Sequence, residues 1–314
     1  MSEEKEPTKG KTVSFTQFSI WSECPFRWYL NYVKKLRVRI ESISTLFGRT
    51  MHEVLQYYLT TMYTQTISEA DGIDLPKLLF DRMCENFLNA QGNHAEMAIT
   101  KEDMVSFFED GCLILDWFVK NKGEYFTKRG FELVGTEVPI EWPVQSGVTM
   151  FGFLDVVIRD TVLNRIKIYD FKTSRQGWNK YQKADKRKLS QLVFYKSFYA
   201  VQYGYDPKDV DVEFLILKRK LYENVAFTQK RVQKVAPASG TISTNNLLLE
   251  LKTFVNTCFD TEGNYRTDIV YEKRPSVKAC KYCDFKDKPD ICDKNNPKRA
   301  ARLIAEMEKK NDTI

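Results

Sequence analysis

The sequence has no run of 18 apolar residues, so it offers no membrane-spanning helix and we expect no membrane partner. Its opening stretch, MSEEKEPTKGK, is acidic and polar, so we expect neither a signal peptide nor an Arg-rich transit peptide. Residues 1–12 are expected to form a disordered tail. The chain also lacks internal repeats, low-complexity tracts and the nucleotide-binding pattern G-x-x-x-x-G-K-S/T.

Composition allows a real core, since 43% of the residues are apolar and 13% are aromatic. The chain has 314 residues, enough for one large domain or two modest ones. The net charge of +6 suits a polyanionic partner without proving one. Seven cysteines, an odd number, favour a reducing, cytoplasmic location over a disulfide framework.

The apolar periodicity changes near residue 130. Helical spacing dominates 13–130, for example over 44–64, 76–90 and the stretch that follows the Thr100 cap. Strand-like alternation follows over 132–142, with Glu137 on the polar side, and we expect further strands at 148–158, 165–171 and 210–217. We also expect a buried helix over 186–203 and a hairpin of 223–227 with 230–235. These patterns predict an α/β or α+β fold with a mixed sheet, comprising a helical region (13–130), a core (131–270) and a C-terminal cysteine segment with a charged helix (271–314).

Two acidic residues interrupt otherwise apolar strands. In RIKIYDFK, the strand period places Ile168, Asp170 and Lys172 on one face, and Asp155 interrupts FGFLDVVI on the strand before it. A buried carboxylate is costly unless it is paired or bound to a metal. If the two strands form a hairpin, Asp155 and Asp170 can meet at one Mg²⁺ or Mn²⁺ ion with Lys172 beside them. Asp170 and Lys172 alone would more often be a surface pair on an edge strand.

The order GFLDVVI, IYDFKTS and QLVFY resembles the RecB-type nucleases of the PD-(D/E)XK superfamily, over about residues 14–295. The resemblance implies a restriction-endonuclease-like mixed-sheet core and a metal-dependent DNA nuclease, most often an exonuclease. It makes Asp155 and Asp170 the metal carboxylates, with the Phe171 main-chain carbonyl as a further ligand, and makes Lys172 the catalytic lysine.

The same resemblance assigns further roles. Gln191 and Tyr195 match its Q-x-x-x-Y motif, whose spacing puts both side chains on one helix face, and are assigned as catalytic residues. His52, in Gly48-Arg-Thr-Met-His52, matches a histidine metal ligand, and Glu137 matches a strand glutamate that is a further candidate ligand. From the residues alone, a lone histidine such as His52 on an apolar helix is more often a core residue, and Gln191 and Tyr195 could be the polar edge of a core helix.

Cysteines form a second pattern. Cys280-Lys-Tyr-Cys283 and Cys292 occur in a charged stretch without a core pattern, which favours a metal centre. Cys24 resembles the isolated early cysteine of the iron–sulfur branch of these nucleases, as in AddB and the CRISPR-adaptation nucleases. That resemblance implies a four-iron, four-sulfur (4Fe-4S) cluster held by these four cysteines, although the gap before Cys292 is longer than usual. Zinc is the alternative occupant.

A basic loop follows the D-x-K motif. Cations that track phosphates and rings that stack on bases suit single-stranded DNA or DNA ends, although a solvated loop would have the same composition. The candidate DNA-binding residues are Arg175, Trp178, Lys180, Tyr181, Lys183, Arg187 and Lys188.

The sequence therefore predicts a Mg²⁺- or Mn²⁺-dependent deoxyribonuclease acting in DNA repair, recombination or replication, or in phage or mobile-element DNA processing. Without a nucleotide-binding motif, unwinding would need a helicase or another recombination or replication partner. The alternatives are a nucleic-acid-binding accessory subunit that does not need catalysis, and a zinc-containing relative with the same nuclease fold.

Overall fold

The computed structural model describes residues 11–37, 40–92, 96–145, 147–288 and 291–293. The chain divides into two compact units, which we describe separately. The sheet unit comprises Arg39–Ile140 and Gly152–Leu247, and the terminal unit comprises Met1–Val38, Glu141–Phe151 and Leu248–Ile314. The charged helix expected after residue 294 and most of the expected tail lie outside the described residues. Within the described ranges, no helix is both long enough and apolar enough to cross a bilayer.

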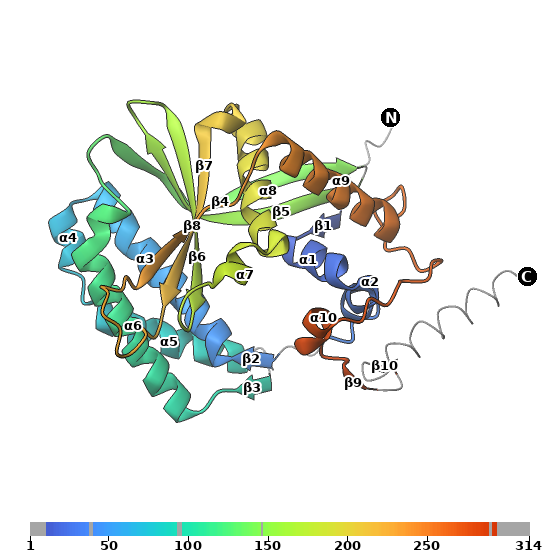
Figure 1. The fold of residues 1–314 in the computed structure, drawn as a ribbon, viewed down its shortest axis with the longest axis horizontal. Helices are drawn as coiled ribbons and strands as arrows, with labels where there is room; N and C mark the ends of the chain where they lie inside the picture. Colours follow the sequence, from blue (N-terminus) through green and yellow to red (C-terminus); the bar gives the residue numbers. More distant parts are fainter. Residues whose placement is uncertain (1–10, 38–39, 93–95, 146, 289–290, 294–314) are drawn as a thin grey trace, which may run out of the picture. The chain divides into compact units, whose positions relative to one another are not determined.

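The first half of the sheet unit is helical, as its apolar spacing predicts (Figure 1). Ser42 caps the longest helix by accepting the N–H of Thr45, and a Thr100–Asp103 capping box starts the next longest. The elements in order are β2 (Ile40–Ser42), α3 (Ile43–Thr64), α4 (Ile67–Asp71), α5 (Leu75–Gly92), β3 (Glu96–Ala98), α6 (Lys101–Asn121) and a 3₁₀ turn (Lys122–Glu124). Strands β2 and β3 pair in parallel as a separate small sheet.

The second half of the unit supplies the main sheet. Its strands are β4 (Phe131–Gln145), β5 (Val148–Asp160), β6 (Arg165–Ser174), β7 (Val210–Lys218) and β8 (Val232–Val235). The order is β5-β6-β7-β8, with β4 beside β5. Strands β5 and β6 are antiparallel, β6 and β7 parallel, and β7 and β8 antiparallel. Helices α7 (Lys180–Lys183) and α8 (Lys186–Tyr203) and a 3₁₀ turn (Pro207–Asp209) connect β6 to β7. The expected mixed sheet flanked by helices is therefore confirmed.

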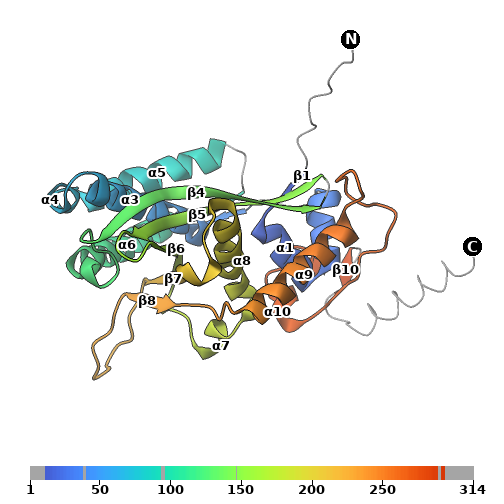
Figure 2. The same cartoon turned by 90° about the horizontal axis from the view of Figure 1, so that it is seen from above.

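One large apolar core joins α3, α5 and α6 to one face of this sheet, and Figure 2 shows α3 and α5 lying over the strands. The apolar stripe of α3, including Phe47, Met51, Leu55 and Tyr58, is fully buried there against strand residues such as Phe171. Helix α8 packs against β6 and β7. Because strand side chains alternate, Phe171 points into the α3 core while its neighbours in β6 point to the other face.

The terminal unit contains β1 (Lys11–Val13), α1 (Phe15–Glu23), α2 (Pro25–Trp28), a π-helical turn (Tyr29–Val33), α10 (Val277–Lys281), β9 (Asp287–Lys288) and β10 (Cys292–Asp293). Helix α9 (Thr241–Cys258) ends in it. Its core centres on Trp28, whose fully buried ring packs edge-on against Phe254, Phe259 and Tyr265. Strand β1 pairs in parallel with the start of β5, so Lys11 and Thr12, which were expected in the tail, belong to a strand.

Two local predictions differ from the structure. The strand expected over 132–142 is present within β4 and Glu137 is exposed, but the alternation does not continue before Glu137, whose φ of +50° lies in the left-handed region: Val134 is exposed while Leu133 packs on the core. The expected strand at 223–227 is instead part of an open loop, residues 219–231, and the hairpin partner of β8 is β7. Asn224, with φ of +55°, turns the chain within that loop, and asparagine tolerates this conformation better than most residues.

Candidate active site

The candidate site begins where the ladder between β5 and β6 opens. The register pairs Val156 with Tyr169, so one more step would place Asp155 opposite Asp170. The recorded pairing stops before that step, and the Asp155 carboxylate instead accepts the Phe171 N–H at 2.7 Å through Oδ2. A side chain thus replaces a main-chain acceptor at this point. Both acidic residues are buried, at the end of the paired stretch.

Each carboxylate has a cationic or potentially cationic neighbour. The His52 Nδ1 atom of α3 lies 3.3 Å from Asp155 Oδ2, and the Lys172 ammonium lies 2.6 Å from Asp170 Oδ2. Among the described residues, the Lys172 ammonium is the one partner of the buried Asp170 Oδ2. A buried oxygen in this state has unused ligating capacity, and carboxylate oxygens are what Mg²⁺ and Mn²⁺ prefer. The donor chemistry of Asp155 and Asp170 therefore suits a divalent cation, provided that the ion replaces their present protein partners.

The pKa values of the two carboxyls are driven apart. Burial, reinforced by the Asp155 charge, raises the pKa of Asp170 to about 6 even though Lys172 opposes the shift. Burial would also raise the pKa of Asp155, but His52, Lys172 and the Phe171 N–H together lower it below its ordinary value. Burial disfavours charge on His52 and Lys172, yet the acidic pair more than compensates and raises the pKa of both. Divergent pKa values in one cluster are typical of catalytic sites.

Glu137 joins this site through a residue that the sequence did not indicate. Gln56 lies one helical turn after His52 and is buried. Its side-chain N–H₂ donates to Glu137 Oε1 at 2.6 Å and to the main-chain carbonyl of Asp155 at 3.2 Å. The left-handed backbone of Glu137 redirects its side chain from the alternation of β4, as a bulge does. The i, i+4 spacing from His52 was the only sequence signal that could have found Gln56.

Helix α8 supplies the remaining pair. Gln191 Nε2 donates to the Tyr195 hydroxyl at 2.7 Å, so the two side chains meet across one helical turn as predicted. Burial, followed by the charge of Asp170, raises the pKa of Tyr195. The tyrosine therefore remains a neutral hydroxyl that faces the acidic cluster. The predicted ligand role of the Phe171 carbonyl is untested by these contacts.

The basic loop after β6 is mostly exposed, but its tryptophan is not. The Trp178 ring packs 5.1 Å from the Phe214 ring, and the Lys188 ammonium lies over it. Stacking on a base would require Trp178 to leave these contacts, so in this structure it anchors the loop. Tyr181 is largely exposed, with the Lys180 ammonium over its ring. Exposed side chains also include Arg175, Lys183 and Lys188, while Arg187 is half-buried.

In the terminal unit, Cys24, Cys280, Cys283 and Cys292 line one pocket, together with apolar side chains such as Phe26 and Phe285. Burial raises the pKa of Cys283 and of Cys292, and the other cysteines of the set add to the rise in both cases. Arg27 and Lys273 act in the opposite direction on these two thiols. The sequence-predicted set thus gathers at one place, among cations that favour thiolates.

No group of three or more His, Cys, Asp or Glu side chains in the described residues is arranged so that it could hold a metal ion. In the acidic cluster of the sheet unit, protein groups already occupy the carboxylates. Asp155 Oδ2 contacts His52 and accepts the Phe171 N–H, and Asp170 contacts Lys172. Metal binding would therefore exchange protein partners for the ion. The same finding covers Cys24, Cys280, Cys283 and Cys292, which line one pocket but are not arranged as a ligand set, so the cysteine assignment remains a prediction.

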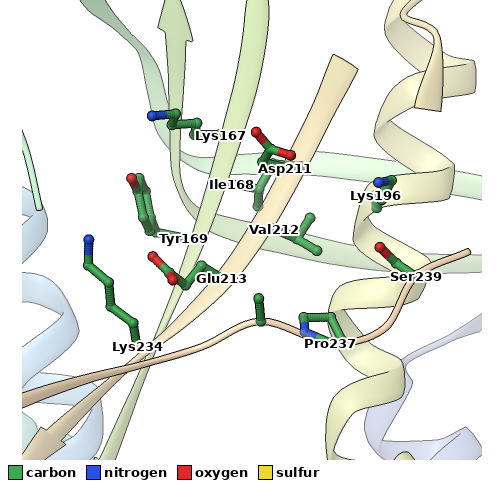
Figure 3. A pocket seen from close by; sticks show the side chains of 11 residues that line it. Lys167, Ile168, Tyr169, Lys196, Asp211, Val212, Glu213, Lys234, Pro237 and Ser239 are labelled. Carbon is green, nitrogen blue, oxygen red and sulfur yellow. The ribbon is translucent and has the colours of Figure 1, made fainter. Parts of the chain in front are cut away.

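A second cavity of the sheet unit, of about 360 Å³, does not resemble a nucleic-acid site. Figure 3 shows Lys167 and Lys234 on one side of the cavity and Lys196 on the other, with Asp211 and Glu213 between them. Burial raises the pKa of Glu213. Two carboxyl groups in the wall would repel phosphates, so we assign this cavity no role in binding DNA.

The mixed sheet flanked by helices and the buried carboxylate–lysine cluster point to a nuclease, and the sequence comparison identifies the superfamily. The model of the PD-(D/E)XK nuclease superfamily matches residues 12–292, and the chain belongs to that superfamily. A solved structure titled "Putative exonuclease", from Eubacterium rectale, is similar over 77% of each chain, with 11% sequence identity and a TM-score of 0.42. A search of curated proteins gave no match.

Proposed function

We propose that the chain is a Mg²⁺- or Mn²⁺-dependent deoxyribonuclease that works as an exonuclease on single-stranded DNA or DNA ends. The observation that carries the proposal is the buried cluster of His52, Asp155, Asp170 and Lys172, whose charges act on one another. A protein with no use for such a cluster would gain stability by losing it. The alternative of a catalytically dispensable binding subunit does not account for that cost.

Asp155, Asp170, His52 and the Phe171 carbonyl would hold the ion, with Glu137 as a further ligand or as the acceptor that orients Gln56. A bound divalent cation lowers the pKa of a coordinated water and neutralises charge on the scissile phosphate. Lys172, with a side chain one-third exposed, would donate to the phosphate oxygens as negative charge develops on them. Gln191 and Tyr195 would orient the phosphate and Lys172, the tyrosine through a hydroxyl that stays protonated.

The basic loop would bind the DNA backbone through Arg175, Lys180, Lys183, Arg187 and Lys188, with Tyr181 available for stacking and Trp178 as the anchor. The four cysteines of the terminal unit would hold a 4Fe-4S cluster, for which thiolate ligands and nearby cations are suitable. Zinc is the competing occupant. A cytoplasmic location, a helicase or recombination partner, and a role in repair or in phage or mobile-element DNA processing stay predictions.

Digestion of end-labelled single- and double-stranded DNA in Mg²⁺ or Mn²⁺ tests the proposal. Asp170→Ala and Lys172→Ala should each abolish cleavage while melting cooperatively. Lys167→Ala is the matched control, because Lys167 lies on the same strand but on its opposite face. Undiminished cleavage by either site variant would remove the assignment. Binding without cleavage by the wild-type protein in both metals would favour the accessory-subunit alternative.

The cysteine centre has a separate test. Anaerobically purified protein should absorb in the visible iron–sulfur bands and contain about four irons per chain. A colourless protein with stoichiometric zinc would show that the same thiols hold zinc instead.

A further inference from the structure

The loop between β7 and β8, residues 219–231, exposes two large rings outside the acidic cluster and the basic loop. We name it the β7–β8 loop. Phe227 is 64% exposed and Tyr222 is 54% exposed. Figure 2 shows the loop as a long open excursion between the two strands. Exposed aromatic side chains grouped in this way are a feature that calls for a binding partner.

The base of the loop is held firmly. Asp110 of α6 is almost completely buried and pairs with Arg219 at 3.0 Å and with Lys220 at 2.7 Å. Arg219 also covers the Phe107 ring, with its guanidinium carbon 3.6 Å from the ring centre. The Arg231 guanidinium donates to the main-chain carbonyl of Arg219 at 2.8 Å. Both ends of the loop are therefore tied to the same place.

The tip is held by a reciprocal pair of hydrogen bonds. The Tyr222 N–H donates to Gln229 Oε1 at 2.8 Å, and Gln229 Nε2 donates back to the Tyr222 carbonyl at 2.7 Å. These bonds use the main-chain N–H and carbonyl of Tyr222, and its side chain remains exposed to solvent. Because the Tyr222 main chain is already held, less conformational entropy is lost when its ring binds a flat partner.

The surroundings of the rings are positively charged. A cavity of about 460 Å³ at the loop is lined by Tyr222 and Phe227 together with Lys218, Lys230 and Lys234. The wall also contains Glu124, which is already engaged by Lys230. Desolvation, and after it the charge of Lys183 from the basic loop, lowers the pKa of Lys218. The charges of Lys218 and Lys183 thus act on one another, and a bound anion would relieve their repulsion.

The loop starts close to the active site. Lys172 is in register with Ile216, and Ser174 with Lys218. Lys218 thus stands two residues beyond Lys172 on the neighbouring strand, about 7 Å further along the sheet. The main chain continues this contact, because Lys220 N–H donates to the Arg175 carbonyl at 2.7 Å. A polymer that occupies the catalytic cluster and the basic loop can extend directly onto the β7–β8 loop.

We propose that the β7–β8 loop binds an unpaired stretch of DNA, with bases stacked on Tyr222 and Phe227 and phosphates held by Lys218 and its neighbour Lys183. This inference rests on the proposed nuclease function for its choice of polymer. Single strands are bound by aromatic rings that stack on the bases and by cations that contact the phosphates. In a duplex the base faces are covered by neighbouring base pairs, so the rings cannot stack on them. The loop therefore discriminates single-stranded DNA from duplex DNA next to the site of cleavage.

The test measures binding in EDTA, so that it does not depend on cleavage. Fluorescence anisotropy of the full chain with a labelled 20-nucleotide oligo(dT) and with a blunt 20-base-pair duplex gives two affinities for each variant. Tyr222→Ala and Phe227→Ala should each weaken single-strand binding about tenfold, and change duplex binding less than threefold. Tyr222→Phe should retain single-strand affinity, because it keeps the ring. Phe80→Ala is the control, since Phe80 is an equally exposed ring (55%) on α5.

Lys218→Gln should reduce the salt dependence of single-strand binding by about one charge, whereas Lys77→Gln on α5 should not. Unchanged single-strand affinity in both ring variants would overturn the proposal. Equal losses on single strand and duplex would also overturn it, since the rings would then act without stacking. If the ring variants bind DNA normally but fail to retain a protein partner, the surface binds protein and not DNA. Ring-dependent binding by a protein that cleaves nothing would support this inference and refute the nuclease function.

Discussion

Replacing Asp170 by asparagine should stabilise the metal-free protein while abolishing cleavage. Asp170 is 1% exposed, and its pKa rises from an ordinary 3.8 to about 6, chiefly because of burial. Each tenfold change in proton affinity corresponds to about 1.4 kcal/mol. The ionised carboxylate therefore costs the fold about 3 kcal/mol above pH 7, and Asp170→Asn, which resembles the protonated form, should recover most of that cost.

The pH dependence has a definite sign. The folded-state pKa lies above the unfolded one, so the penalty is absent below pH 3.8, grows as pH rises, and is complete above pH 6. The gain from Asp170→Asn should thus be about 3 kcal/mol at pH 7.5 and about half as large at pH 5. Urea unfolding in EDTA at both pH values measures it.

A variant less stable than wild type at pH 7.5 in EDTA would refute this reasoning. It would mean that the ion pair of Asp170 with Lys172 outweighs the desolvation of the carboxylate. Added Mn²⁺ supplies an internal control, because it should stabilise the wild type and leave the asparagine variant nearly unchanged.

Three further predictions follow from contacts outside the acidic pair. Gln56→Ala should lower the cleavage rate about tenfold with little change in DNA affinity, because the side chain positions Glu137 and the Asp155 main chain; single-turnover rates beside anisotropy measure this, and an equal loss of affinity would contradict it. Asp110→Ala should cost about 3 kcal/mol in urea unfolding and expose the β7–β8 loop to trypsin, since it leaves two cations without their buried partner; unchanged stability would show that the two ion pairs contribute nothing. Cys24→Ser should remove the visible absorbance or the bound zinc, whereas Cys84→Ser on α5 should not; retention of a full centre by Cys24→Ser would exclude it as a ligand.

The sequence predicted the sheet and the acidic cluster well, because both depend on periodicities that are local. The alternation in RIKIYDFK placed Asp170 and Lys172 on one face, and they form an ion pair. The apolar spacing of α3 and the span of α8 were confirmed for the same reason. Which face of a helix or strand is buried follows from the apolar periodicity of that segment, so it can be predicted from the segment alone.

The rest depends on contacts between distant segments. The bulge-like backbone at Glu137 and the buried role of Gln56 arise because β4 and α3 meet at the site, 81 residues apart in sequence. Trp178 was expected at the DNA surface, but Phe214 of β7 lies beneath it. The strand expected at 223–227 gave way to a loop fixed by Gln229 and Arg231. Residue propensities describe single positions, so they do not predict contacts between segments that are distant in sequence.

The hydrogen bond from the Phe171 N–H to Asp155 has a practical consequence for mutagenesis. Asp155→Ala would delete the acceptor of a buried amide as well as a metal ligand, and an amide stranded in this way costs about 1–3 kcal/mol. An inactive alanine variant at this position would therefore mix misfolding with lost chemistry. Asparagine, which retains the oxygen that the amide needs, separates the architectural duty of this carboxylate from its enzymatic one.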